Sequence, residues 1–129
     1  MNKAPETTYG ISDLASEFDI TPRAIRFYED QGLLAPSRVG SVRVYAQRDR
    51  TRLKLTLRGK RLGLSLLDIK DLVEMYETPQ DTVPQLKKFL TVLAAHRAQL
   101  AQQQQDIADM LGEITQHEAK CKKLLKAAA

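Results

Sequence analysis

Apolar residues at helical spacing predict a short helix near the beginning of the chain. Its apolar face consists of Ile11, Leu14, Ala15 and Phe18, at positions i, i+3, i+4 and i+7. Ser12 is the expected N-cap of this helix. The two residues that follow Phe18 connect it to the next element.

A second short helix is predicted directly after this tight connection. Thr21 is its expected N-cap, and Pro22 occupies the first helical position, where the missing N–H of proline costs nothing. Gly32 ends the helix. Ile25 and Tyr28 share one face, which is expected to pack on the first helix, and such a pair of helices is a helix-turn-helix unit.

The opposite face of the second helix carries Arg23, Arg26, Phe27 and Asp30. Arginine can direct two parallel donors at guanine or at phosphate oxygens, so this face is a candidate surface for DNA. A surface helix with solvated arginines and a half-buried aromatic residue is the alternative that the helix alone leaves open.

The next segment alternates in the manner of short strands. Pro36, Gly40 and the alternating Val42 and Val44 predict two strands joined by a small turn. A hairpin directly after a helix-turn-helix is a wing, and its tip residues are candidates for contact with backbone phosphates or the minor groove: Arg38, Ser41 and Arg43. A structural hairpin with incidental arginines is the competing interpretation.

Two more helices are expected before residue 77. The first runs from about Gln47 to Leu62, with leucines facing inward and a densely basic outer face. The second begins at Ser65, in a capping-box arrangement with Asp68. Its apolar stripe consists of Leu66, Ile69, Leu72, Val73 and Tyr76. Two prolines within 77–84 then indicate a domain boundary, which gives a DNA-binding domain at 1–77 and a linker at 78–84.

Beyond residue 84 the apolar pattern changes to heptads, which predict one coiled-coil helix over 85–126 and a frayed tail at 127–129. The residues at the first and fourth positions of the heptads form an apolar face along this helix, here called the seam. A helix of this length cannot bury its seam on so small a domain and needs a partner, most simply a second copy. The residues expected at the dimer interface are Leu86, Phe89, Leu93, Leu100, Ile107, Met110, Leu111, Ile114 and Cys121. Polar seam residues lower the strength of the coil and fix its register: His96, Gln103 and His117.

The net charge of +4 on 129 residues is unevenly distributed. Residues 1–61 carry 12 Lys/Arg against 7 Asp/Glu, whereas residues 62–129 carry 8 against 9. Within 38–61, nine basic residues stand against Asp49 alone. This asymmetry indicates a front half that faces a polyanion. A solvated basic helix is the alternative that charge alone does not remove.

Several classes of protein are disfavoured by the composition. The one cysteine cannot form a disulfide or a paired-cysteine zinc site within the chain. The first residues lack the apolar core of a signal peptide, and no apolar run is long enough to span a bilayer, so a cytoplasmic location is expected. An enzyme is not expected, because both histidines lie in the coil, no glycine-rich phosphate loop is present, and Glu29 and Asp30 read as helix-end residues. No cofactor is predicted.

One constellation remains as a weak candidate for a metal site. His117 and Cys121 lie at i and i+4, and His96 of a partner helix could approach them in an antiparallel dimer. Side chains at these coil positions ordinarily pack, so no metal is predicted.

Three segments in order carry a wider resemblance: YGISDLASEFDITPRAIRFYEDQGLL, RVGSVRVYAQRD and RLGLSLLDIKDL, within residues 9–73. Together with the long coil behind them, they resemble the MerR family of bacterial transcriptional regulators. The turn departs from the family pattern at Asp19 and Ile20, where Gly-Val is usual, and the wing departs at residues 40–43. Arg50 occupies a position that is more often aliphatic, so extra charge is expected on the third helix.

The resemblance implies a mainly α fold, with a winged helix-turn-helix domain, a small β-hairpin wing and a long helix in an antiparallel coiled-coil dimer. It implies a homodimer that binds a palindromic promoter beside RNA polymerase and distorts the DNA. Carried over by position, the DNA contacts are Thr21, Arg23, Arg26, Phe27, Tyr28, Arg43, Tyr45 and Lys60.

Metal-sensing relatives place cysteines at the start of the long helix, where this chain has none, so a mercury-type or iron–sulfur-type sensor is not expected. The coil resembles the subgroup that controls branched-chain amino acid and acyl-CoA breakdown, and a small-molecule effector stays unidentified. A nonspecific architectural DNA-binding protein or a coiled-coil adaptor is the alternative.

Overall fold

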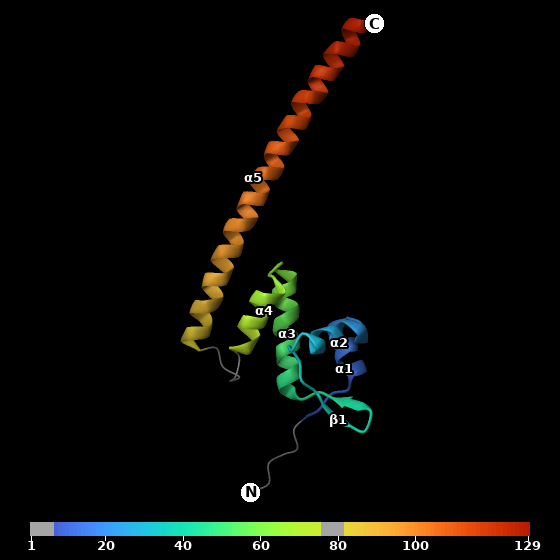
Figure 1. Ribbon diagram of the computed structural model, residues 1–129, viewed down its shortest axis with the longest axis vertical. Helices are drawn as coiled ribbons and strands as arrows, with labels where there is room; N and C mark the ends of the chain where they lie inside the picture. Colours follow the sequence, from blue (N-terminus) through green and yellow to red (C-terminus); the bar gives the residue numbers. More distant parts are fainter. Residues whose placement is uncertain (1–6, 76–81) are drawn as a thin grey trace. The chain divides into compact units, whose positions relative to one another are not determined.

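Helices and a single hairpin account for almost all of the described chain. The structure is a computed structural model that describes residues 7–75 and 82–129. The elements follow in the order α1 (Ile11–Phe18), α2 (Pro22–Asp30), β1 (Ser37–Val39), β2 (Val42–Val44), α3 (Gln47–Arg61), α4 (Leu66–Glu74) and α5 (Val83–Ala128) (Figure 1). The chain divides into two units, residues 1–88 and 89–129. The predicted mainly helical fold, with a wing and a long C-terminal helix, is confirmed.

Local capping interactions set the ends of the first two helices. Gly10 is the N-cap of α1, and its N–H donates to the Asp13 carboxylate at 2.8 Å. The prediction of Ser12 as N-cap is therefore wrong. Asp13, at the third helical position, accepts from the N–H of Gly10, so the helix begins directly after Gly10. The Thr21 hydroxyl accepts from the Ala24 N–H at 3.1 Å, which confirms the predicted cap of α2. Gly32 ends α2 with a φ of 80°, a conformation that favours glycine.

The core of unit 1 lies where the helices meet. The side chains of Ile25 and Tyr28 on α2 are buried, as predicted, and Leu14 of α1 is fully buried. The buried hydrophobic residues of the later elements are Leu33, Leu34, Tyr45, Leu53, Leu64, Ile69 and Val73.

Two charged residues of α3 point inward, so the predicted outer basic face is incomplete. Arg52 is only 7% exposed, and its Nε donates to the Leu33 carbonyl at 2.6 Å. The buried Asp49 carboxylate accepts the backbone N–H groups of Ala35 and Ala46, each at 3.0 Å. The two side chains thus pair backbone groups of Leu33 and Ala35 in the segment after α2, and Asp49 also pairs the N–H at the start of α3. Leaving such groups buried and unpaired would destabilise the fold.

Arg50 does not add free charge to α3, contrary to the expectation from the sequence. Its Nε donates to both carboxylate oxygens of Glu17, at 3.0 and 2.9 Å, so α3 is tied to α1. Its guanidinium carbon also lies 5.9 Å from the ring centroids of Tyr9 and Phe18. The hydrogen bond from Arg50 lowers the pKa of Glu17.

The long helix begins and ends outside the predicted bounds. The Thr82 hydroxyl accepts from the Gln85 N–H, and the Gln85 amide oxygen accepts from the Thr82 N–H, so the pair forms a capping box. Pro84 therefore lies inside the first turn of the helix, where proline is tolerated. Residues 127 and 128, assigned to the predicted frayed tail, are alanines within the helix in this structure. Residues 76 and 78–81, assigned to the α4 stripe and the linker, lie outside the described residues.

Close packing of α3 on α4 makes Gly59 sensitive to substitution. A Cβ at Gly59 would lie 2.7 Å from Cγ1 of Ile69, which is buried and cannot move away freely. We expect Gly59→Ala to reduce the free energy of unfolding by roughly 1–3 kcal/mol through overpacking. Gly112→Ala is the matched control: no atom lies within 4 Å of its Cβ, so the helix should gain about 1 kcal/mol. Urea unfolding measures both, and equal effects of the two substitutions would contradict the packing argument.

Candidate nucleic-acid interface

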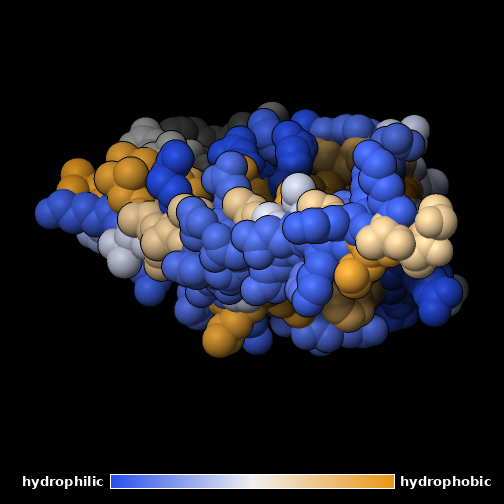
Figure 2. Space-filling view, turned by 90° about the horizontal axis from the view of Figure 1, so that it is seen from above, coloured by the Kyte–Doolittle hydropathy of each residue, from blue (hydrophilic) through white to orange (hydrophobic). Residues whose placement is uncertain are grey.

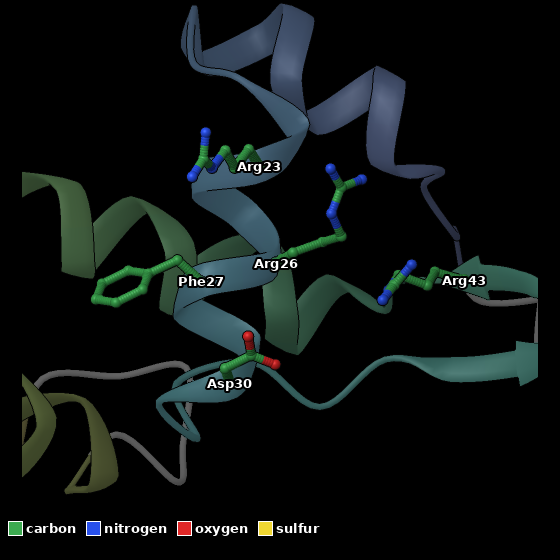
Figure 3. A pocket seen from close by; sticks show the side chains of 5 residues that line it. All are labelled: Arg23, Arg26, Phe27, Asp30 and Arg43. Atoms are coloured by element: carbon green, nitrogen blue, oxygen red, sulfur yellow. The ribbon is translucent and has the colours of Figure 1, made fainter.

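Arginines from two elements surround a shallow hollow beside α2. Because Ile25 and Tyr28 are buried, the helix turns its other face to solvent, as predicted. The hollow has a volume of about 460 Å³ and is lined by Arg23, Arg26, Phe27 and Asp30 of α2 and Arg43 of β2 (Figure 3). Figure 3 shows Arg26 extending toward the side on which Arg43 lies, whereas Phe27 extends the opposite way. The surface is open, cationic and flanked by an aromatic ring.

The hairpin places its two arginines next to each other. β1 and β2 pair antiparallel with Arg38 opposite Arg43, and Gly40 in the turn has a φ of 65°. Arg43 Nε donates to the Glu29 carboxylate of α2 at 2.9 Å, and Arg38 Nη2 lies 4.0 Å from the other oxygen of that carboxylate. Sequence reasoning treated Glu29 as a helix-end residue and missed this contact, because nothing in the local pattern shows that the hairpin returns to α2.

Lys60 approaches the same helix from α3. Its ammonium donates to the Tyr28 hydroxyl at 3.2 Å and lies 5.7 Å from the centroid of that ring. Phe27 meets Tyr28 edge to face at 5.7 Å and is 47% exposed. The structure thus brings the predicted aromatic pair and Lys60 together, with the Tyr28 hydroxyl held by the lysine. Tyr28 is only 3% exposed, so burial disfavours the predicted direct contact of its ring with DNA.

The remaining predicted contacts differ in exposure. Thr21 and Arg38 are exposed, and Ser41 is exposed in the turn of the hairpin. Tyr45 has no exposed surface at all, so the prediction of a DNA contact from this ring is wrong. Its backbone exchanges hydrogen bonds with Tyr9, both at 2.8 Å, and this pairing at the end of the wing turns the side chain into the core.

The Tyr45 hydroxyl is buried, and no hydrogen-bond partner for it is found among residues 7–75 and 82–129. Burial, reinforced by the negative charge of Glu29, raises the pKa of Tyr45 to about 12. A neutral phenol is therefore favoured in the folded state. The stability this contributes is complete below pH 10 and is lost as the pH rises through about 12.

We expect Tyr45→Phe to leave DNA affinity unchanged and to raise the free energy of unfolding at pH 7 by about 1 kcal/mol, because it removes a buried hydroxyl that has no hydrogen-bond partner among the described residues. Between pH 10 and 12 the variant should lose less stability than the parent protein, since only the parent must keep this phenol neutral. Urea unfolding across that range measures the difference. If the free energy of unfolding changes with pH in the same way for both proteins, the hydroxyl is not buried as described.

The seam of α5 carries apolar side chains that are exposed in the single chain. Leu100, Ile107, Met110, Leu111 and Ile114 are each about half exposed. Leu86 and Cys121 are also exposed, whereas Phe89, Leu93 and His96 are half-buried. No group of three or more His, Cys, Asp or Glu side chains that could hold a metal occurs within the described part of the chain.

Hydrophilic residues cover most of the face shown in Figure 2, and hydrophobic residues form separate patches on it. Among residues 7–75 and 82–129, no helix is both long and apolar enough to cross a bilayer.

Comparisons with known proteins show to which family this chain is similar. Residues 9–76 match the family described as MerR HTH family regulatory protein, and residues 50–117 match the family described as MerR, DNA binding. The chain is 32% identical to the HTH-type transcriptional regulator CueR of Salmonella typhi over 80 residues, which are 60% of this chain and 58% of CueR. It thus spans little more than half the length of that regulator.

Solved structures agree with the sequence comparison. A MerR-family transcriptional regulator from Bacillus cereus superposes with a TM-score of 0.66 at 28% identity, over 85% of this chain and 79% of that one. HiNmlR, a MerR family regulator that lacks the sensor domain and is bound to promoter DNA, superposes with a TM-score of 0.56 at 28% identity, over 78% and 79% of the two chains. Since the first family match alone covers more than half of the residues and includes the helix-turn-helix, the wing and α4, this chain belongs to the MerR family of helix-turn-helix regulators.

Proposed function

We propose that the protein is a sequence-specific DNA-binding transcriptional regulator in which α2 enters the major groove and the wing contacts the flanking backbone. One observation carries the proposal: Arg23 and Arg26 of α2 and Arg43 of β2 line a single open hollow. Arginine at such a surface can bind guanine bidentately or neutralise phosphate. Members of the family are regulators rather than enzymes, and HiNmlR is a relative bound to promoter DNA.

The protein is proposed to act as a homodimer, with residues 1–77 binding DNA and α5 forming an antiparallel coiled coil. Leucine and isoleucine side chains along the seam of α5 are half exposed in the single chain, and a second copy would cover them. Two recognition helices held at a fixed separation require two half-sites, so the operator should be palindromic. A separation that does not match relaxed DNA would bend or untwist the duplex.

Titrations of duplex DNA test this proposal. The palindrome in the promoter beside the protein's own gene is compared with a scrambled duplex of equal length, across a range of salt concentrations. We expect tighter binding to the palindrome, and an affinity that falls with a slope of about 0.9 per neutralised phosphate in a plot of log K against log salt. Equal affinity for both duplexes would favour the architectural DNA-binding protein, and no binding to either would favour the adaptor.

We also propose that the protein controls amino-acid or acyl-CoA catabolism. This part of the proposal depends on the resemblance of the coil sequence to the subgroup of the family with that role. Footprinting at the same promoter, with RNA polymerase and with or without acyl-CoA compounds, tests it. A protected region or hypersensitive sites that change with the compound are the expected result.

A further inference from the structure

The wing has little of its own to hold it in place. Its strands, Ser37–Val39 and Val42–Val44, have three residues each and, within the part of the chain that the structure describes, pair only with each other in a two-stranded sheet. An isolated hairpin of this size is marginally stable in water. The base is anchored by the backbone pairing of Tyr45 with Tyr9. The arginine-bearing part of the hairpin needs a separate attachment to stay beside α2.

The Glu29 carboxylate provides that attachment. It lies in the last turn of α2, and one oxygen accepts from Arg43 Nε at 2.9 Å while the other lies 4.0 Å from Arg38 Nη2. Because Arg38 and Arg43 are direct cross-strand partners, one carboxylate reaches both strands. The side chains of Glu29 and Arg43 are only 18% and 25% exposed, so solvent screens this pair less than it screens an ordinary surface ion pair.

The contact also orients Arg43 for DNA. A guanidinium has five N–H donors in a fixed plane, and the bond to Glu29 uses only the one on Nε. The terminal nitrogens remain available on a side chain that lines the hollow with Arg23 and Arg26 (Figure 3). A negative charge on a surface that faces phosphate opposes binding by its charge, so any benefit from Glu29 must come through the arginines that it holds.

We propose that Glu29 is a positioning residue for DNA recognition, whose carboxylate holds the wing arginines against α2 so that the wing and the recognition helix meet DNA as one unit. This role presupposes the DNA binding proposed above. Glu29 itself need not touch DNA.

Glu29→Gln tests the role, because glutamine keeps the size of the side chain and removes the charge. A pure charge effect would strengthen binding to operator and to random DNA by the same factor. Positioning predicts instead that the ratio of operator to random affinity falls by roughly tenfold, because backbone contacts from a held wing fix the register of α2 on the operator and each dimer has two wings. Asp19→Asn is the matched control, because it removes one exposed carboxylate from the same helix-turn-helix unit away from the wing. Its ratio should equal that of the parent protein.

A double-mutant cycle separates positioning from a general effect on folding. If Glu29 acts through Arg43, adding Glu29→Gln to Arg43→Gln should leave the affinity ratio unchanged. A further fall in the ratio of the double variant, of the size seen in the parent background, would overturn the proposal.

Hydrogen exchange of the free protein tests the attachment without DNA. Amides of residues 37–44 should exchange roughly fivefold faster in Glu29→Gln, while amides of α3 keep the rates of the parent protein. Arg43→Gln breaks the same bond from the strand and should give the same acceleration, so the test stands even if Glu29→Gln does not fold. Unchanged wing exchange in Arg43→Gln would overturn the proposal. If the parent protein shows no operator preference, the proposed function fails, while the exchange data still decide whether Glu29 tethers the wing.

Discussion

Ile107→Glu is expected to convert the proposed dimer into monomers and to weaken operator binding by more than about 100-fold. Ile107 occupies a seam position near the middle of α5 and is 53% exposed in the single chain, so the proposed partner helix would bury it. A carboxylate at this position would have to be buried without a counter-charge, at a cost of several kcal/mol, and each dimer would contain two. Once the chains separate, one recognition helix no longer assists the binding of the other.

Ala108→Glu is the control for the charge itself. Ala108 is the next residue along α5 and lies outside the seam, so the same new charge stays in solvent. Sedimentation equilibrium measures the association, and fluorescence anisotropy measures the affinity for the operator. An Ile107→Glu protein that sediments as a dimer and binds the operator normally would remove α5 as the dimerisation element.

Arg23→Ala is expected to reduce the preference for operator over random DNA by about 30-fold or more. Arg23 is exposed on α2 and lines the hollow, where its guanidinium can form two parallel hydrogen bonds to a guanine. Each bidentate contact is worth roughly 1–3 kcal/mol of discrimination, and a dimer makes two of them. The loss should appear as a changed sequence preference, with little change in the salt dependence.

Lys60→Ala supplies the comparison. Lys60 lies at the edge of the interface, with its ammonium on the Tyr28 hydroxyl, and a point charge at this position suits phosphate rather than a base. Its removal should weaken binding to all duplexes by the same factor and lower the salt slope by about one for each protomer. If Arg23→Ala also weakens operator and random DNA equally, Arg23 contacts phosphate and does not read bases.

Helices α1 and α2, the wing and the long helix α5 followed from the sequence, because each is encoded by neighbours in the chain. The Thr21–Pro22 start of α2 and its end at Gly32 are local capping signals, and the structure confirms them. The exposed arginines of the hollow followed from the same helical period, once Ile25 and Tyr28 were assigned to the buried face. The predicted starts of α1 and α5 were wrong, because Asp13 and Gln85 cap these helices at earlier residues.

Only the tertiary structure decided which charged and aromatic side chains remain at the surface. The sequence predicted extra surface charge from Arg50 and a DNA contact from Tyr45 of the wing. In the structure, Arg50 pairs with Glu17 of α1 and Tyr45 is buried. Glu29 was predicted to be an ordinary helix-end residue, but its carboxylate joins α2 to the wing. These outcomes depend on contacts between residues 14 to 33 positions apart in the sequence, which no local periodicity predicts. An amphipathic period reports which face of an element is apolar, whereas the partner of a charge is set by the packing of whole elements.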